Sequence, residues 1–151
     1  MTTGGDIVLV EDSDEDAELT MRALKRQKLA NNVRRLSDGQ QAIDYFFGTP
    51  ANGEQDVPRV VLLDLKLPMV NGLEILRRLK TEARTHNIPV VVLTSSKEDR
   101  DLEEAYRLGV NSYIVKPVEF DKFMGAVESV GLYWMLINQP PCALLRSGRC
   151  S

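Results

Sequence analysis

Residues 60–65 have the sequence VVLLDL, in which five apolar side chains surround one aspartate, Asp64. A continuous apolar run of this length is typical of a central parallel strand that is buried on both faces. An aspartate that only caps a helix or forms a turn stands among turn residues, whereas Asp64 interrupts a strand. The stretch therefore predicts a buried central strand that carries one functional carboxylate.

Short apolar runs and longer amphipathic stretches alternate on both sides of this strand. We expect further strands at 33–36, 90–93, 112–115 and 7–10, and helices at 14–28, from 39, around 73–79, after 96 and at 119–134. Five strand–helix pairs in strict alternation predict one α/β domain with a parallel sheet. Right-handed crossovers then place helices on both faces of that sheet.

Three residues are expected at helix ends. Asp14 is interpreted as a cap of the first helix, because carboxylates are favourable at a helix N-terminus. Ser96 begins a capping box and is expected to cap the fourth helix. Gly109 is expected to end that helix, since glycine readily adopts the left-handed conformation found there.

Length and charge exclude several classes of protein. The 151 residues are about one domain long, and 43% hydrophobic with 27% charged residues is ordinary for a globular domain. Nineteen basic and 22 acidic residues give a net charge of −3, which argues against a nucleic-acid-binding face. No apolar run approaches the roughly 18 residues of a membrane span, and no secretory signal is recognised, so we expect a cytoplasmic protein.

The C-terminal part of the sequence has two further features. Cys142 and Cys150 lie in a tail, where they could close only a small loop, and are interpreted as reduced thiols. Apolar side chains at 132–137 fall partly off the inward stripe of the last helix, and a spare apolar patch is typical of an interface.

Charged and polar side chains follow the predicted strands at the edge where their carboxyl ends meet. They are Glu11, Asp12, Asp64, Thr94 and Lys116. Clustered carboxylates are unfavourable unless they share a positive charge. Oxygen ligands without His or Cys suit Mg²⁺ and not zinc, so the sequence predicts a magnesium site.

The same residues match the charge of a phosphoryl group, which spreads negative charge over three oxygens in its transition state. Metal on Glu11 and Asp12 would neutralise one oxygen, Lys116 would pair with a second, and Thr94 would donate a hydrogen bond to a third. Asp64 is then the nucleophile that forms an acyl-phosphate.

Four motifs stand in this order along the chain: Val10-Glu11-Asp12-Ser13, the run 62–68 with Asn71-Gly72, Val92-Leu93-Thr94-Ser95, and Tyr113-Ile114-Val115-Lys116-Pro117. Together they resemble the receiver domain of two-component response regulators over about residues 7–130. The resemblance implies a flavodoxin-like (βα)5 doubly wound domain with strand order 2-1-3-4-5. It implies a receiver domain at 1–137 and a C-terminal tail at 138–151.

The resemblance also implies roles for the site. Asp64 matches the phosphorylated aspartate, and Glu11, Asp12, Asp64 and the backbone carbonyl of Lys66 match the Mg²⁺ ligands. Lys116 matches the family's invariant lysine. The implied function is that of a phosphoacceptor signalling protein, and its only catalysis is magnesium-dependent phosphoryl transfer to itself and autodephosphorylation.

Three more positions match residues with conformational roles in the family. Thr94 matches the switch hydroxyl, Tyr113 the aromatic side chain whose rotamer follows phosphorylation, and Pro117 a proline that is usually cis. The face formed by the fourth helix, fifth strand and fifth helix is then expected to change its affinity for partners.

Other functions fit part of the pattern. An aspartyl phosphatase would need a second aspartate two residues after its nucleophile, where this chain has Lys66. A flavin or nucleotide module needs a loop of small residues with free N–H groups after the first strand, where Glu11 and Asp12 have the wrong charge. An inactive scaffold would lack matched site residues, which here are present.

A narrower resemblance is to the single-domain response regulators of bacterial and cyanobacterial phytochromes. It is carried by Val10-Glu11-Asp12-Ser13 with Asp16 and Leu19-Thr20, by the loop 48–58 and by Leu132-Tyr133-Trp134. It implies a phytochrome sensor histidine kinase as partner and a homodimer formed through the last two helices, the fifth strand and an extension at 131–141. The interface residues expected there are Tyr133, Trp134, Leu136 and Ile137.

Overall fold

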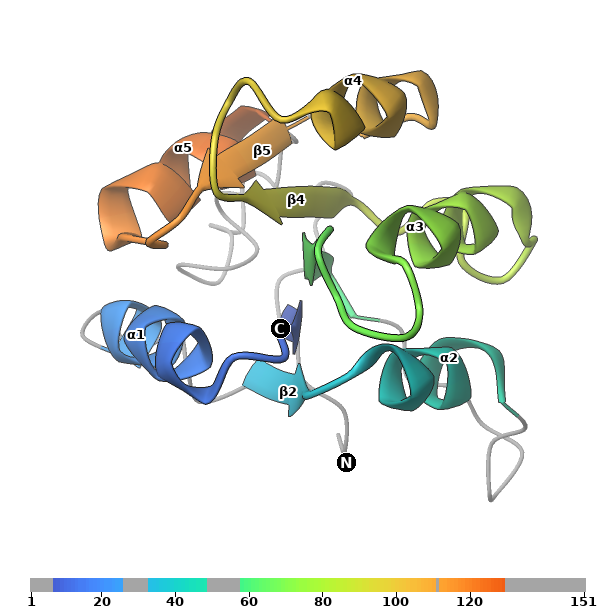
Figure 1. The fold of residues 1–151 in the computed structure, drawn as a ribbon, viewed down its shortest axis with the longest axis horizontal. Coiled ribbons are helices and arrows are strands. Elements are labelled where there is room, and N and C mark those ends of the chain that lie inside the picture. Colours follow the sequence, from blue (N-terminus) through green and yellow to red (C-terminus); the bar gives the residue numbers. More distant parts are fainter. Residues whose placement is uncertain (1–6, 26–32, 49–57, 111, 130–151) are drawn as a thin grey trace, which may run out of the picture.

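The computed structural model describes residues 7–25, 33–48, 58–110 and 112–129. It contains five strands and five helices in strict alternation: β1 Ile7–Val10, α1 Asp14–Lys25, β2 Val33–Leu36, α2 Gly39–Phe47, β3 Val60–Asp64, α3 Gly72–Thr81, β4 Val90–Thr94, α4 Arg100–Arg107, β5 Ser112–Val115 and α5 Phe120–Ser129. The strands form one parallel sheet in the order β2-β1-β3-β4-β5 (Figure 1). The predicted fold class and strand order are confirmed.

The central strand is β3, as the sequence predicted. It pairs with β1 on one side and β4 on the other, and all five of its residues are buried. The strand ends at Asp64, one residue before the predicted end, and Leu65 still donates its N–H to the carbonyl of Leu93 at 3.3 Å. The carboxylate of Asp64 therefore lies at the last ladder position of a fully buried strand.

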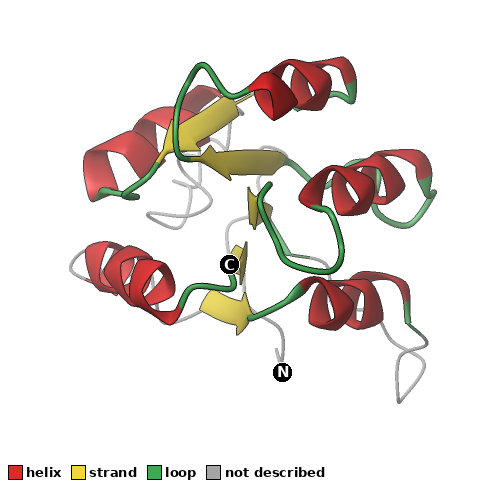
Figure 2. Cartoon of the chain, viewed as in Figure 1, coloured by secondary structure: helices red, strands yellow, loops and turns green. Residues whose placement is uncertain are grey.

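Helices cover both faces of the sheet, with α1 and α5 on one face and α2, α3 and α4 on the other (Figures 1 and 2). Successive side chains of a strand point to opposite faces. Val60 and Leu62 accordingly pack in the core under α1 and α5, while Val61 and Leu63 pack in the core under α2, α3 and α4. This alternation also decides the direction of polar side chains at the strand ends.

Two of the expected helix caps are wrong. The side chain of Ser13, and not Asp14, accepts the N–H of Asp16 at 3.1 Å, because residue 14 is already helical and its exposed carboxylate is free to pair with Arg35 at 2.8 Å. Asp99, and not Ser96, caps α4, because residues 97 and 98 form a turn before the helix begins at Arg100.

Hydrogen bonds define the start of α4, and a glycine follows its end. The Ser96 hydroxyl accepts the N–H of Glu98 at 3.0 Å, and Asp99 then accepts the N–H of Asp101 at 2.9 Å. Gly109 follows the last turn of α4 with φ +108°, so its predicted role at this end is confirmed. None of the described helices is both long and apolar enough to cross a bilayer.

Several predictions fall outside the described residues. They are the end of the first helix at 26–28, most of the loop 48–58, the end of the last helix at 130–134, the interface residues Tyr133, Trp134, Leu136 and Ile137, and the tail with Cys142 and Cys150. The boundary between receiver domain and tail stays a prediction.

Gly72 lets α3 start directly against the end of β3. A Cβ atom there would lie 2.6 Å from the Asp64 carbonyl oxygen and 2.7 Å from the Leu65 Cα, and backbone atoms cannot move aside as a flexible side chain can. The absence of a side chain at this position therefore permits the close approach of helix and loop behind Asp64.

Gly72→Ala is expected to lower the free energy of unfolding by about 1–3 kcal/mol, because the added methyl overpacks this contact. Gly125→Ala in α5 is the matched control, since nothing lies within 4 Å of its Cβ position. The control should gain up to about 1 kcal/mol from better helix propensity. Urea unfolding of both variants measures the difference, and equal effects would contradict the packing argument.

Candidate functional site

Glu11, Asp64 and Lys116 come together at the carboxyl end of the sheet because of strand alternation. Each lies two residues beyond a side chain in the core under α1 and α5, at the ends of β1, β3 and β5. Parallel strands end at the same edge of the sheet, so the three side chains point to the same face there, although β4 lies between β3 and β5. The sequence predicted this convergence.

The Lys116 ammonium lies among three carboxylates. Its Nζ is 3.1 Å from Glu11 Oε1, 3.0 Å from Asp64 Oδ2 and 3.1 Å from Asp16 Oδ2. Sequence reasoning did not include Asp16 in the site. The available signal was its place in the first turn of α1, three residues after the Ser13 cap, because that turn begins at the same sheet edge.

Burial shapes the charge of this cluster. Burial, followed by the charge of Asp64, raises the pKa of Glu11 to about 7, although the Lys116 hydrogen bond partly offsets this. Burial alone would lower the pKa of Lys116, but hydrogen bonds to Asp64 and Asp16 outweigh it and raise that pKa. One fixed positive charge thus faces several carboxylates, which leaves the site short of positive charge.

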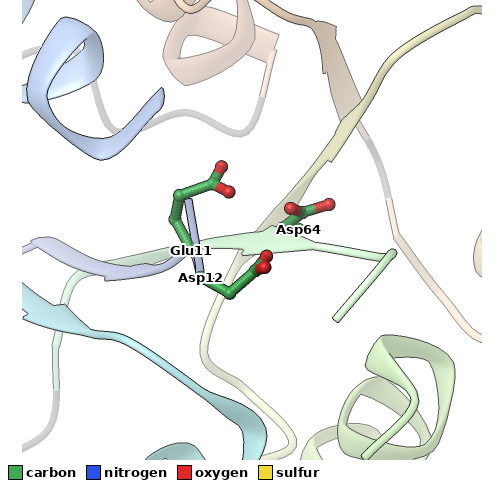
Figure 3. A group of neighbouring side chains, drawn as sticks. All are labelled: Glu11, Asp12 and Asp64. Carbon is green, nitrogen blue, oxygen red and sulfur yellow. The ribbon is translucent and has the colours of Figure 1, made fainter. Parts of the chain in front are cut away.

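Three carboxylates could share a metal ion. Glu11, Asp12 and Asp64 each offer an oxygen within 4.8 Å of the others (Figure 3). Asp12 is more exposed than the other two. Within the described ranges this is the group of side chains that could hold a metal, and its all-oxygen donor set fits Mg²⁺ or Mn²⁺.

Backbone and side-chain contacts hold the two acidic segments in place. Arg35 on β2 donates from Nε and Nη2 to the Glu11 carbonyl at 3.1 and 2.8 Å, which anchors the turn carrying Glu11 and Asp12. The Lys66 N–H donates to Asp64 Oδ1 at 3.0 Å, and its ammonium pairs with Asp101 at 3.1 Å. Arg35 was not predicted, because only the pairing of β2 with β1 brings it near.

Thr94 and Tyr113 lie on the other face of the sheet. Thr94 is two residues beyond Val92 in the core under α2, α3 and α4, and its hydroxyl hydrogen-bonds to the loop after β4. Tyr113 is half-buried against the same core, and its ring meets Tyr106 edge to face at 6.3 Å between centroids. The Lys116–Pro117 peptide bond is cis.

Comparison with known proteins identifies the class. The family model of the response regulator receiver domain matches residues 7–128, so the chain belongs to this family. The probable methanogenesis regulatory protein FilR2 of Methanothrix harundinacea is 44% identical over 135 residues, which is 89% of this chain and 86% of that protein. The solved bacteriophytochrome response regulator AtBRR is 47% identical with a TM-score of 0.79, over 91% of this chain and 100% of that one.

Two further relatives have been solved, one with a bound metal ion and one phosphorylated. The Mn²⁺-bound form of response regulator Rcp1 is 32% identical with a TM-score of 0.68, over 89% of this chain and 97% of that one. The phosphorylated cyanobacterial phytochrome response regulator RcpA is also 32% identical, with a TM-score of 0.70 over 88% and 95%. This chain is therefore a receiver domain similar to phytochrome response regulators.

Asp12→Asn is expected to stabilise the metal-free protein by on the order of 1 kcal/mol, because it removes one of the mutually repelling carboxylates. It should also reduce the stabilisation that Mg²⁺ gives the wild type, since a ligand is lost. Urea unfolding in EDTA and in Mg²⁺ measures both effects. Asp44→Asn, which makes the same charge change at an exposed position on α2, should keep the wild-type response to Mg²⁺. An Asp12→Asn variant that also kept this response would contradict the metal site.

Proposed function

We propose that this receiver domain accepts a phosphoryl group on Asp64 from a phosphohistidine of a sensor histidine kinase. The main support is the position of the Asp64 carboxylate, which is buried at a strand end, held by the Lys116 ammonium and flanked by two more carboxylates. In the transfer, the P–N bond of phosphohistidine breaks as a P–O bond to Asp64 forms. A bound Mg²⁺ would supply the positive charge that the cluster lacks.

Each neighbouring group has a function in this step. Lys116 already contacts Asp64 Oδ2 and can pair with a phosphoryl oxygen attached there. Glu11, Asp12, Asp64 and the Lys66 carbonyl would hold Mg²⁺. In this proposal the protein both catalyses the transfer and accepts the phosphoryl group. It acts as a signalling protein, and the signal ends when the acyl-phosphate is hydrolysed.

Thr94 and Tyr113 would convert phosphorylation into a change of surface. The phosphoryl group adds nearly two negative charges at Asp64 and three strong acceptor oxygens. The Thr94 hydroxyl would move toward these oxygens, and Tyr113 would turn into the space it leaves. Because Tyr113 contacts Tyr106 on α4, the face formed by α4, β5 and α5 would change its partner affinity.

Asp64→Asn is expected to abolish labelling by acetyl phosphate with Mg²⁺, because an amide cannot act as the nucleophile. Intact-mass spectrometry should show one added phosphoryl group on the wild type and none on the variant. Asp44→Asn, at an exposed position on α2, should be labelled like the wild type. Persistent labelling of Asp64→Asn would refute the assignment of the acceptor.

The partner we propose is a phytochrome sensor histidine kinase in the cytoplasm, on the basis of the similarity to AtBRR and RcpA. A radiolabelled phytochrome kinase from the same genome should transfer phosphate to the wild type faster than kinases of other sensor types do. The rate should also differ between red and far-red light. Equal transfer from unrelated kinases would contradict the partner.

We also propose a homodimer formed by α4, β5, α5 and the segment 131–141, as the sequence resemblance implies. Trp134→Ala should shift the mass measured by light scattering toward the monomer. Leu19→Ala is the control, because Leu19 is an exposed apolar residue on α1, away from this face. A dimer unchanged by Trp134→Ala would contradict the proposed interface.

A further inference from the structure

The hydroxyl of Thr94 is engaged on the side away from the carboxylate cluster. Its Oγ1 is 2.9 Å from the Ser96 carbonyl oxygen and 3.3 Å from Asp99 Oδ2, and it accepts the Ser96 N–H at 3.2 Å. A hydroxyl has one proton to donate. While that proton is donated to these acceptors, Thr94 cannot donate it to a phosphoryl oxygen on Asp64.

Asp99 is the charged member of this arrangement and is also the N-cap of α4. Its Oδ1 accepts the N–H of Asp101 at 2.9 Å and so caps the helix, while Oδ2 faces Thr94. The side chain is only 9% exposed, and Lys66 Nζ lies 3.7 Å from Oδ1. Hydrogen bonds to a charged acceptor are stronger than neutral ones, so Asp99 adds to the hold of the loop on Thr94.

Resting on the function proposed above, we infer that Asp99 is a positioning residue that competes with the phosphoryl group for the Thr94 hydroxyl. In the unphosphorylated domain Asp99 holds this hydroxyl on the α4 side. In the phosphorylated domain the hydroxyl leaves Asp99, so the first residue affected is the cap of α4. The signal therefore reaches the start of α4 directly, in addition to any movement of Tyr113.

The competition has a thermodynamic consequence. A contact made only in the resting conformation stabilises that conformation and lowers the population of the active one. Removing the acceptor should therefore favour every state in which Thr94 turns to Asp64. Because the Ser96 carbonyl remains as an acceptor, we expect a change of about three- to tenfold and not a complete shift.

Asp99→Asn separates the two functions of this side chain. Asn is as good a helix cap as Asp, and its single oxygen can keep the bond to the Asp101 N–H. The remaining position is then an NH₂ group, which cannot accept the proton of Thr94. Asp101→Asn is the matched control, because it removes the same charge two residues further along the chain, also beside Lys66, without a contact to Thr94.

Titration with beryllofluoride and Mg²⁺, a mimic of the phosphorylated aspartate, tests the inference. Asp99→Asn should bind about three- to tenfold more tightly than the wild type, and Asp101→Asn should stay within about twofold. In a Thr94→Ala background Asp99→Asn should have no further effect, since the competition needs the hydroxyl. Urea unfolding checks that the cap of α4 is intact.

A second measurement distinguishes this role from general loosening of the loop. In the methyl NMR spectrum of the free protein, Asp99→Asn should move the Thr94 signal toward its position in the beryllofluoride-bound wild type. Equal affinities of Asp99→Asn and Asp101→Asn, or an Asp99→Asn effect that persists with Thr94→Ala, would overturn the inference alone. A wild type that binds no beryllofluoride would instead overturn the proposed function on which it rests.

Discussion

The ammonium of Lys116 makes a buried group of carboxylates possible at the carboxyl end of the sheet. Charges are costly to bury unless they are paired, and Glu11 and Asp64 are both almost fully enclosed. Lys116 contacts both of them and Asp16, which ties β5 to β1, β3 and α1 through one group. One lysine cannot balance the charge of all these carboxylates. The cluster therefore still attracts a cation, even though its contact with Lys116 stabilises the fold.

The sheet separates the carboxylate cluster from the two residues that we propose as a switch. Glu11, Asp64 and Lys116 continue the strand positions that face α1 and α5, whereas Thr94 and Tyr113 continue those that face α2, α3 and α4. A change at Asp64 must therefore cross the sheet edge to reach α4, and Thr94 at the end of β4 is placed for this. Its hydrogen bond to Asp99 shows that Thr94 is already linked to the start of α4.

Burial and strand alternation are local properties of the chain, so the sequence itself predicted an alternating α/β domain and the convergence of Glu11, Asp64 and Lys116. The strand order came instead from the resemblance to receiver domains. Asp64 inside an apolar run and the acids after β1 were recognisable without any tertiary contact. Asp16 and Arg35 were missed, since their roles depend on how a helix turn and an edge strand pack against the site. The caps of α1 and α4 were wrong by one and three residues, because several polar residues stand at each loop and only the backbone path selects among them.

The hydrogen bonds of Lys116 connect residues far apart in the chain. They span 105 residues to Glu11, 100 to Asp16 and 52 to Asp64. Such nonlocal contacts form late relative to local ones, because the loops between them must close first. A growing chain thus contains Asp64 before Lys116, and the buried carboxylates gain their contact with the ammonium only when the fifth strand has joined the sheet.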